Sequence, residues 1–187
     1  MMPSFYVSHP EVVVEPAVPI EQWGLSDAGF ARARRLPDIL HGRVERIVSS
    51  AERKAVETAA VLGSAIGVTP VIDPHLGELD RSATGYLPEV EFDAVVEAFF
   101  AEPDQSVRGW ERAGDAQRRT VAAVRRIAAS APGTPTVYVG HGGVGALLLA
   151  SLRTAAIDRS CDQPGMGSVF AFDPDAWTAM GGWERIR

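Results

Sequence analysis

Two short apolar segments that each lead into a histidine constrain this chain most. Residues 5–7 precede His9, and residues 137–139 precede Gly140 and His141. Short runs of aromatic and β-branched residues predict β-strands. Because the carboxyl ends of parallel strands meet at one edge of a sheet, we expect His9 and His141 to open onto a common site.

Further strands and helices are predicted to alternate along the chain. Strands are expected at residues 46–50, 70–72 and 136–139, with two last, edge strands at 168–172 and 183–186. Helices are expected near 26–36, 52–66, 89–101, 112–131 and 144–152, with Pro37 and Gly42 closing the first and Gly67 ending the second. This alternation predicts one domain over 1–187: a three-layer α/β/α sandwich with a mostly parallel central sheet.

Composition narrows the class of protein. A hydrophobic content of 46% and a charged content of 22% are typical of a folded globular chain, and a formal net charge of −6 argues against broad nucleic-acid binding. No apolar run reaches the ~20 residues that span a bilayer. Cys161 is the only cysteine, so no intramolecular disulfide can form. Together with an N-terminus that lacks a signal-like pattern, this predicts a cytoplasmic protein without nucleic-acid or membrane partners.

Five segments then follow one another in a characteristic order. They are the first strand with His9, Leu-Ser-Asp-Ala-Gly at 25–29, Ser-Ser-Ala-Glu-Arg-Lys-Ala-Val-Glu-Thr-Ala at 49–59, Leu-Gly-Glu at 76–78 and Gly-His-Gly-Gly-Val at 140–144. In these motifs the chain resembles the histidine phosphatase (phosphoglycerate mutase-like) superfamily, from His9 to about Leu152. The resemblance implies a phosphoglycerate mutase-like fold and a phosphomonoesterase that uses neither a metal nor another cofactor.

The resemblance also implies roles for individual residues. His9 would attack phosphorus and form a phosphohistidine, which its ordinary pKa of ~6.5 allows near neutral pH. His141 would hydrogen-bond a nonbridging phosphoryl oxygen, and Gly142 would let backbone amides at a helix start approach the anion. Glu78 matches the proton donor to the leaving oxygen, a role that requires a raised pKa.

The chain departs from the family pattern around the phosphate. The family has arginine before the nucleophilic histidine and glycine after it, whereas this chain has Ser8, which donates only a neutral hydrogen bond, and Pro10, which has no amide hydrogen. Lys54 stands where the family has a second phosphate-binding arginine, and it lacks the bidentate guanidinium fork. Arg53 lies ~100° around the same helix and should point elsewhere.

Another arginine is a candidate to restore the missing positive charge. Arg81, Arg108 and Arg112 all lie on segments that can reach the site, and Arg112 is favoured because it opens the helix after Gly-Trp-Glu at 109–111. The predicted phosphate-binding residues are therefore Ser8, Lys54, Arg112 and Gly142. Two weakened charged contacts of ~3 kcal/mol each would make a slow enzyme.

Several functional hypotheses stay open. The first is a phosphomonoesterase acting on a small phosphorylated substrate or a phosphoprotein; the second is a degenerate member that binds phosphorylated ligands or a partner protein without turnover. Three other classes rank lower: a mutase, a metal-dependent hydrolase and a serine esterase. The sequence lacks closely spaced metal ligands for the second class and a Gly-x-Ser-x-Gly nucleophile elbow for the third. Specificity should come from residues 11–23 and 81–100, while the substrate and the oligomeric state stay undetermined.

Overall fold

The computed structural model describes residues 3–40 and 44–187, within which seven strands form one sheet. The spatial order is β3-β2-β4-β1-β5-β6, and β7 also pairs with β5. The strands are β1 (Ser4–Ser8), β2 (Arg46–Ser49), β3 (Val71–Ile72), β4 (Thr136–Gly140), β5 (Ser168–Asp173), β6 (Thr178–Ala179) and β7 (Glu184–Arg185).

The sheet is mostly parallel, as predicted. Strands β3, β2, β4 and β1 run parallel, whereas β5 pairs antiparallel with β1, β6 and β7. The prediction of β5 as an edge strand was wrong, because it lies between β1 and the short strands β6 and β7. Its side chains explain the position: Phe170 and Phe172 pack in one core cluster and Val169 in another, so both faces of β5 are covered.

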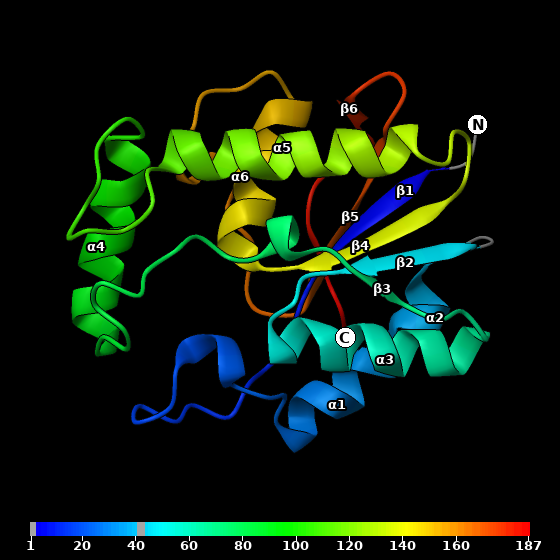
Figure 1. Cartoon of the computed structure of the whole chain (residues 1–187), viewed down its shortest axis with the longest axis horizontal. Coiled ribbons are helices and arrows are strands. Elements are labelled where there is room, and N and C mark those ends of the chain that lie inside the picture. Colours follow the sequence, from blue (N-terminus) through cyan, green and yellow to red (C-terminus); the bar gives the residue numbers. More distant parts are fainter. Residues whose placement is uncertain (1–2, 41–43) are drawn as a thin grey trace.

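Helices cover both faces of the sheet (Figure 1): α5 and α6 lie on one side, and α1, α2 and α3 on the other. The α-helices are α1 (Asp27–Ala33), α2 (Leu36–Ile39), α3 (Arg53–Ile66), α4 (Glu89–Ala101), α5 (Ala113–Ala129) and α6 (Gly142–Leu152). Three 3₁₀ turns, η1 (Ile20–Gln22), η2 (Pro74–Leu76) and η3 (Arg159–Cys161), lie in the connections. Helix α4 stands apart from both layers (Figure 1), and the three-layer α/β/α prediction is confirmed.

The helix predicted at 26–36 is in fact two helices. Ser26 caps α1 as expected, since its Oγ accepts a hydrogen bond from the Gly29 amide at 3.1 Å. Pro37 lies in the first turn of α2, where a missing N–H breaks no helical hydrogen bond, so it helps to begin a helix rather than to end one. The predicted stop at Gly42 lies outside the described residues, whereas Gly67 ends α3 with a φ of 72°, as predicted.

Alternating side chains of the central strands form two cores. On β4, Tyr138 packs with Tyr6 on the face covered by α5 and α6, while Val137 and Val139 pack with Val7 on the opposite face. All of these side chains are fully buried. Burial of each such side chain stabilises the fold by roughly 1.5–3 kcal/mol, so both faces hold β1 and β4 firmly together.

A glycine sets how closely α6 approaches β1. A Cβ atom at Gly145 would lie 2.6 Å from the Tyr6 ring and 2.7 Å from the Trp183 ring. Tyr6 is fully buried in the core cluster and stacks on Phe170 with ring centroids 5.4 Å apart, and the partly buried Trp183 packs against the same cluster. Because the Tyr6 ring is enclosed, a larger residue would push the start of α6 away from the end of β1.

We therefore predict that Gly145→Ala destabilises the protein by ~1–3 kcal/mol, the usual cost of overpacking a core. The sign is informative, since alanine has the higher helix propensity and stabilises an uncrowded helical site. Urea unfolding measures the effect, with Ser64→Ala at an exposed position of α3 as the matched control. A Gly145→Ala protein as stable as the control would contradict this packing.

Candidate active site

The two histidines meet at the carboxyl ends of β1 and β4, as the sequence predicted. Ser8 and Gly140, the last residues of these parallel strands, are register partners, and the His9 amide donates to the Gly140 carbonyl at 3.0 Å. The imidazole rings of His9 and His141 lie with centroids 5.4 Å apart at an angle of 68°. Adjacent strand ends therefore form the centre of the site.

His9 is oriented by the residue that follows it. Its Nδ1 lies 2.8 Å from the carbonyl oxygen of Pro10. A carbonyl only accepts, so Nδ1 carries the proton and Nε2 keeps a free lone pair. Burial lowers the pKa of His9 to about 4, although the hydrogen bond to Pro10 raises it in part. At neutral pH His9 is an uncharged imidazole with a nucleophilic Nε2. Pro10, which lacks an amide hydrogen, contributes its carbonyl instead.

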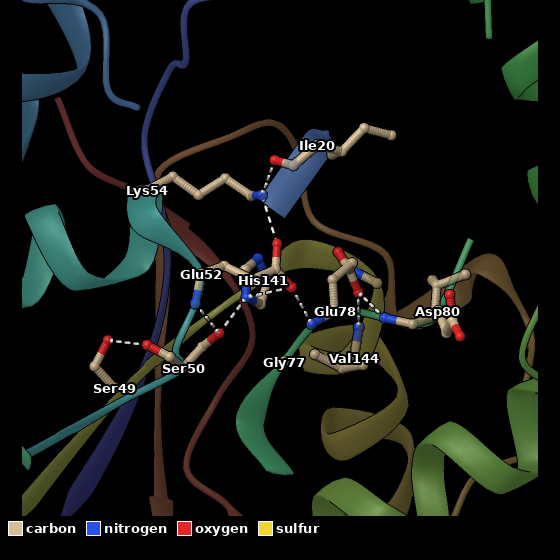
Figure 2. A network of polar contacts seen from close by, with 12 residues as sticks. Ile20, Ser49, Ser50, Glu52, Lys54, Gly77, Glu78, Asp80, His141 and Val144 are labelled. Atoms are coloured by element: carbon tan, nitrogen blue, oxygen red, sulfur yellow. Dashed lines mark hydrogen bonds and ion pairs between the residues drawn. The ribbon is translucent and has the colours of Figure 1, made fainter. Parts of the chain in front are cut away.

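His141 is fully buried and lies in the polar network that Figure 2 shows. Its Nε2 is 2.8 Å from Ser50 Oγ, which also accepts a hydrogen bond from the Glu52 amide at 3.2 Å. Because Ser50 Oγ already accepts from the Glu52 amide, its own hydrogen is free to be donated to Nε2, and a neutral His141 then carries its proton on Nδ1. This Nδ1 is buried and has no partner among the described residues. Burial lowers the pKa of His141 well below its ordinary value, in keeping with a neutral ring.

Tyr6 fixes the backbone of His141. Its hydroxyl accepts a hydrogen bond from the His141 amide at 3.0 Å and donates one to the His141 carbonyl at 3.1 Å. A Cβ at Gly140 would lie 2.3 Å from this hydroxyl, so only glycine fits there. Tyr6 could not be identified from the sequence, because an aromatic residue in a strand is indistinguishable from an ordinary core residue.

Glu78 is bound at the N-terminus of α6. Its Oε1 accepts hydrogen bonds from the amides of Leu79 and Val144, both at 3.1 Å, and Oε2 accepts one from Gly143 at 3.2 Å. Burial raises the pKa of Glu78, and the neighbouring carboxylate of Glu52 raises it further. Since Oε2 accepts only one amide hydrogen, it is the oxygen with room for a proton. The raised pKa matches the requirement for an acid.

Glu52 joins the other groups of the site and was missed in the sequence (Figure 2). Its Oε1 accepts from the Glu78 amide at 2.8 Å and lies 3.4 Å from His141 Nε2, while Oε2 pairs with Lys54 Nζ at 2.5 Å. Burial acts to raise its pKa, but His141 and Lys54 outweigh this effect and lower the pKa to about 2. Glu52 is therefore ionised, and nothing in its position before a helix distinguishes it from a capping carboxylate.

Lys54 lies on the wall of the site, as predicted, with its charge already engaged. Its side chain is buried, and Nζ donates to the carbonyl of Ile20 at 2.9 Å as well as to Glu52. Arg53 points away from the site, as expected from helical geometry, and pairs with Glu57 at 2.7 Å. Lys54 can reach an anion only in competition with Glu52.

Ser8, which was predicted to bind phosphate, has its hydroxyl engaged within the protein. Ser8 is fully buried, where its Oγ donates to Gln163 Oε1 at 2.5 Å and accepts from the Ser168 amide at 3.0 Å. Gln163 lines the cavity instead, and its Nε2 would be 2.0 Å from a Cβ at Gly142. Within the described chain this Nε2 has no hydrogen-bond partner. Gln163 follows Ser8 by 155 positions, which no local sequence pattern could reveal.

Arg112, the arginine favoured from the sequence, lies outside the cavity. It is exposed just before α5, because its neighbours Ala113 and Gly114 occupy the buried side of that turn. Arg108 pairs with Glu91 at 3.2 Å. Of the three candidate arginines, Arg81 lines the cavity, and its guanidinium carbon lies 5.0 Å from the ring centroid of Phe92. The Arg81 guanidinium makes no hydrogen bond or ion pair to any residue that the structure describes, so its charge is available to a ligand.

Several residues of the site line one cavity of about 640 Å³. Around His9, its polar wall includes Lys54, Glu78, Arg81, Gly142, Gly143 and Gln163. No cluster of three or more histidine, cysteine or carboxylate side chains suited to a metal ion occurs within residues 3–40 and 44–187. In the same part of the chain, no helix combines the length and apolar character needed to cross a membrane.

The fold and this pair of histidines define a phosphoglycerate mutase-like α/β protein. A family model of the histidine phosphatase superfamily, branch 1, matches residues 20–179, and the chain therefore belongs to that superfamily. The matched segment contains Lys54, Glu78 and His141, whereas His9 precedes it.

Individual relatives agree with this assignment. Glucosyl-3-phosphoglycerate phosphatase of Mycolicibacterium vanbaalenii is 28% identical over 173 residues, which cover 86% of this chain and 74% of that protein. The solved complex of a mycobacterial glucosyl-3-phosphoglycerate phosphatase with inorganic phosphate superposes with a TM-score of 0.79 at 23% identity, covering 98% of this chain and 95% of that one. YhfR of Bacillus stearothermophilus gives 0.76 at 21% identity, covering 99% and 95%. At these identities the two structures show a shared fold.

The lowered pKa of His9 predicts a pH dependence of stability. Between its ordinary value of 6.5 and the folded value of about 4, the unfolded chain binds a proton that the folded chain does not. Stability should therefore fall as the pH drops through this window, by up to ~1.4 kcal/mol per pH unit from His9. In urea unfolding from pH 7 to pH 4.5, His9→Asn should weaken this dependence, and Ser64→Ala, at an exposed position without a titratable side chain, should not. Equal slopes in all three proteins would contradict the assigned pKa.

Proposed function

We propose that this protein is a metal-independent phosphomonoester hydrolase that acts through a phosphohistidine at His9. The observation that carries the proposal is the tautomer of His9: Nδ1–H is bound to the Pro10 carbonyl, so Nε2 presents its lone pair beside His141. The cavity that His9 lines is suited to a small phosphorylated substrate, and the relative named above is a phosphatase.

The reaction has two balanced steps. In the first, His9 Nε2 forms a bond to phosphorus as the ester P–O bond breaks, and the leaving oxygen takes the proton of Glu78 Oε2. In the second, the Glu78 carboxylate takes a proton from water as the water oxygen attacks phosphorus. The N–P bond breaks, its electron pair returns to Nε2, and inorganic phosphate leaves.

Donors around His9 would stabilise the charge on the transferred phosphoryl group. His141 Nδ1–H and the Arg81 guanidinium are unpartnered within the described residues, and so is the Gly142 amide in the first turn of α6. Gln163 Nε2 adds a neutral donor where the family pattern has an arginine. Donors of this kind contribute ~3 kcal/mol each to transition-state binding when they are held rigidly.

The first test of this function is removal of the nucleophile. We expect wild-type protein with chelator present to release phosphate from phosphomonoesters, and His9→Ala to lose at least ~10³-fold in kcat/KM, the scale of a lost nucleophile. His75→Ala is the matched control, because that histidine is 65% exposed and lies outside the cavity. Intact-mass analysis of acid-sensitive adducts should detect a phosphorylated wild-type protein and none in His9→Ala. Full activity of His9→Ala would refute the assignment.

A second test addresses the proton donor. We expect Glu78→Gln to lower kcat for alkyl phosphates by ~10²-fold, the usual contribution of a general acid. The loss for nitrophenyl phosphate should be much smaller, because that leaving group departs without a proton. The comparison of the two esters within one variant is its own control for folding. Equal losses on both esters would show that Glu78 has only a structural role.

One observation favours a second candidate, a protein that binds phosphorylated ligands without turnover. Lys54 is neutralised by Glu52 and Ser8 is turned to Gln163, so the site has less free positive charge than the family pattern provides. Such a protein would release no phosphate from any ester, yet phosphate would raise its unfolding temperature by preferential binding to the folded state. Phosphate release by wild type and His9→Ala, measured together with thermal unfolding in the presence of phosphate, distinguishes the hydrolase from the binding protein.

A further inference from the structure

The cavity extends from His9 into a region with mainly apolar walls, which we call the apolar chamber. It is lined by Val14, Trp23, Leu79, Tyr86, Phe92 and Val96. These residues come from the segment before α1, from the segment that follows Glu78 and from α4. The two stretches in which the sequence placed specificity thus contribute most of this wall.

Specific contacts hold the walls of the apolar chamber in place. The indole nitrogen of Trp23 donates to the carbonyls of Glu15 and Val18, both at 3.0 Å, which closes the segment before α1 into a loop. Tyr86 lies against the indole with ring centroids 6.1 Å apart. Across the chamber, the Phe92 ring lies under the Arg81 guanidinium, so the apolar wall adjoins the cation proposed to bind phosphate.

Charges on the outer wall are unfavourable to a second anionic group. Glu89 and Asp93 of α4 line the cavity as free carboxylates, within the described chain, that no arginine or lysine pairs. Arg159 also lines it, but its guanidinium is held by Glu97 and by Asp162, the latter at 3.0 Å. A leaving group that carried a carboxylate would meet repulsion here and would find no cation to bind it.

From this geometry we propose that the substrates are monophosphate esters of uncharged, largely apolar alcohols, whose apolar part occupies the chamber while phosphate lies at His9 and Arg81. The proposal rests on the hydrolase function proposed above and names its substrate class. A glucosyl-phosphoglycerate, the ester named for the relatives, combines a carboxylate with many hydroxyl groups. The carboxylate and the hydroxyl groups of such an ester would lie against this wall without hydrogen-bond partners.

The test uses three esters of primary alcohols, so that their intrinsic reactivities are similar. They are 2-(1-naphthyl)ethyl phosphate, glycerol 3-phosphate and 3-phosphoglycerate. Each ~55 Å² of apolar surface removed from water corresponds to about tenfold in binding. We expect kcat/KM for the naphthyl ester to exceed that for glycerol 3-phosphate at least ~10-fold, with 3-phosphoglycerate the poorest.

A matched pair of variants localises the effect. Val14 and its neighbour Val13 are 53% and 48% exposed, and only Val14 lines the cavity. We expect Val14→Asp to reduce the preference for the naphthyl ester over glycerol 3-phosphate about tenfold, on the scale of a charge placed against an apolar group. Val13→Asp should keep the wild-type preference. The pair therefore separates chamber contacts from a general effect of added negative charge.

Calorimetric binding of the same esters to His9→Ala tests the chamber without turnover. If wild-type protein hydrolyses no ester but the naphthyl ester binds His9→Ala at least ~10-fold more tightly than glycerol 3-phosphate does, the hydrolase proposal fails and the ligand class stands. If all esters are hydrolysed without preference, or if Val14→Asp and Val13→Asp behave alike, the ligand class is refuted and the hydrolase stands. If only the naphthyl ester fails to bind and to react, the ligand class is refuted, and if every ester fails to bind and to react, both proposals are refuted.

Discussion

The parallel pairing of β1 with β4 is the constraint on which the site depends. It sets Ser8 beside Gly140, so the residues that follow, His9 and His141, emerge next to each other. Tyr6 then fixes the start of α6, because its hydroxyl hydrogen-bonds both the amide and the carbonyl of His141. The same helix start then binds the Glu78 carboxylate. Two strands, one hydroxyl and one helix N-terminus thus determine where His9, His141 and Glu78 lie.

The parts of this site that could be predicted are those encoded locally. A strand that ends in histidine is visible in the sequence, and so is the Gly-rich start of α6. Gln163 was not identified, and Arg81 was only one of three candidates, because their positions depend on loops packed against distant elements. Arg112 was favoured because it opens a helix, but that helix turns its small residues inward and leaves Arg112 exposed, outside the cavity. Likewise, Pro37 taken alone predicts the end of a helix. The chain instead turns at residues 34–35, so Pro37 falls in the first turn of the next helix, α2.

Charge is arranged differently here from the family pattern. Where an arginine would precede the nucleophile, Ser8 is buried and binds Gln163, which offers a neutral amide to the cavity. Where a second arginine would bind phosphate, Lys54 is paired with Glu52, which also binds the Glu78 amide. Glu52 therefore both positions Glu78 and restrains Lys54. A phosphate dianion would meet hydrogen-bond donors and the Arg81 guanidinium, the one unpaired cation among the described residues that line the cavity, so less of its binding can come from cations.

An apolar ligand group in the apolar chamber would offset the smaller number of free cations around the phosphate. An apolar group that fills the chamber excludes water from the side of the site that would otherwise be open. In such an environment, the attraction between a phosphoryl oxygen and a fixed donor is several times stronger than in water. His141 Nδ1–H and Arg81 would then contribute more to the transition state than the same groups in a solvated pocket. Binding energy from the apolar part of the ligand would thus offset the missing arginine, and an ester too small to exclude water would react slowly for electrostatic reasons.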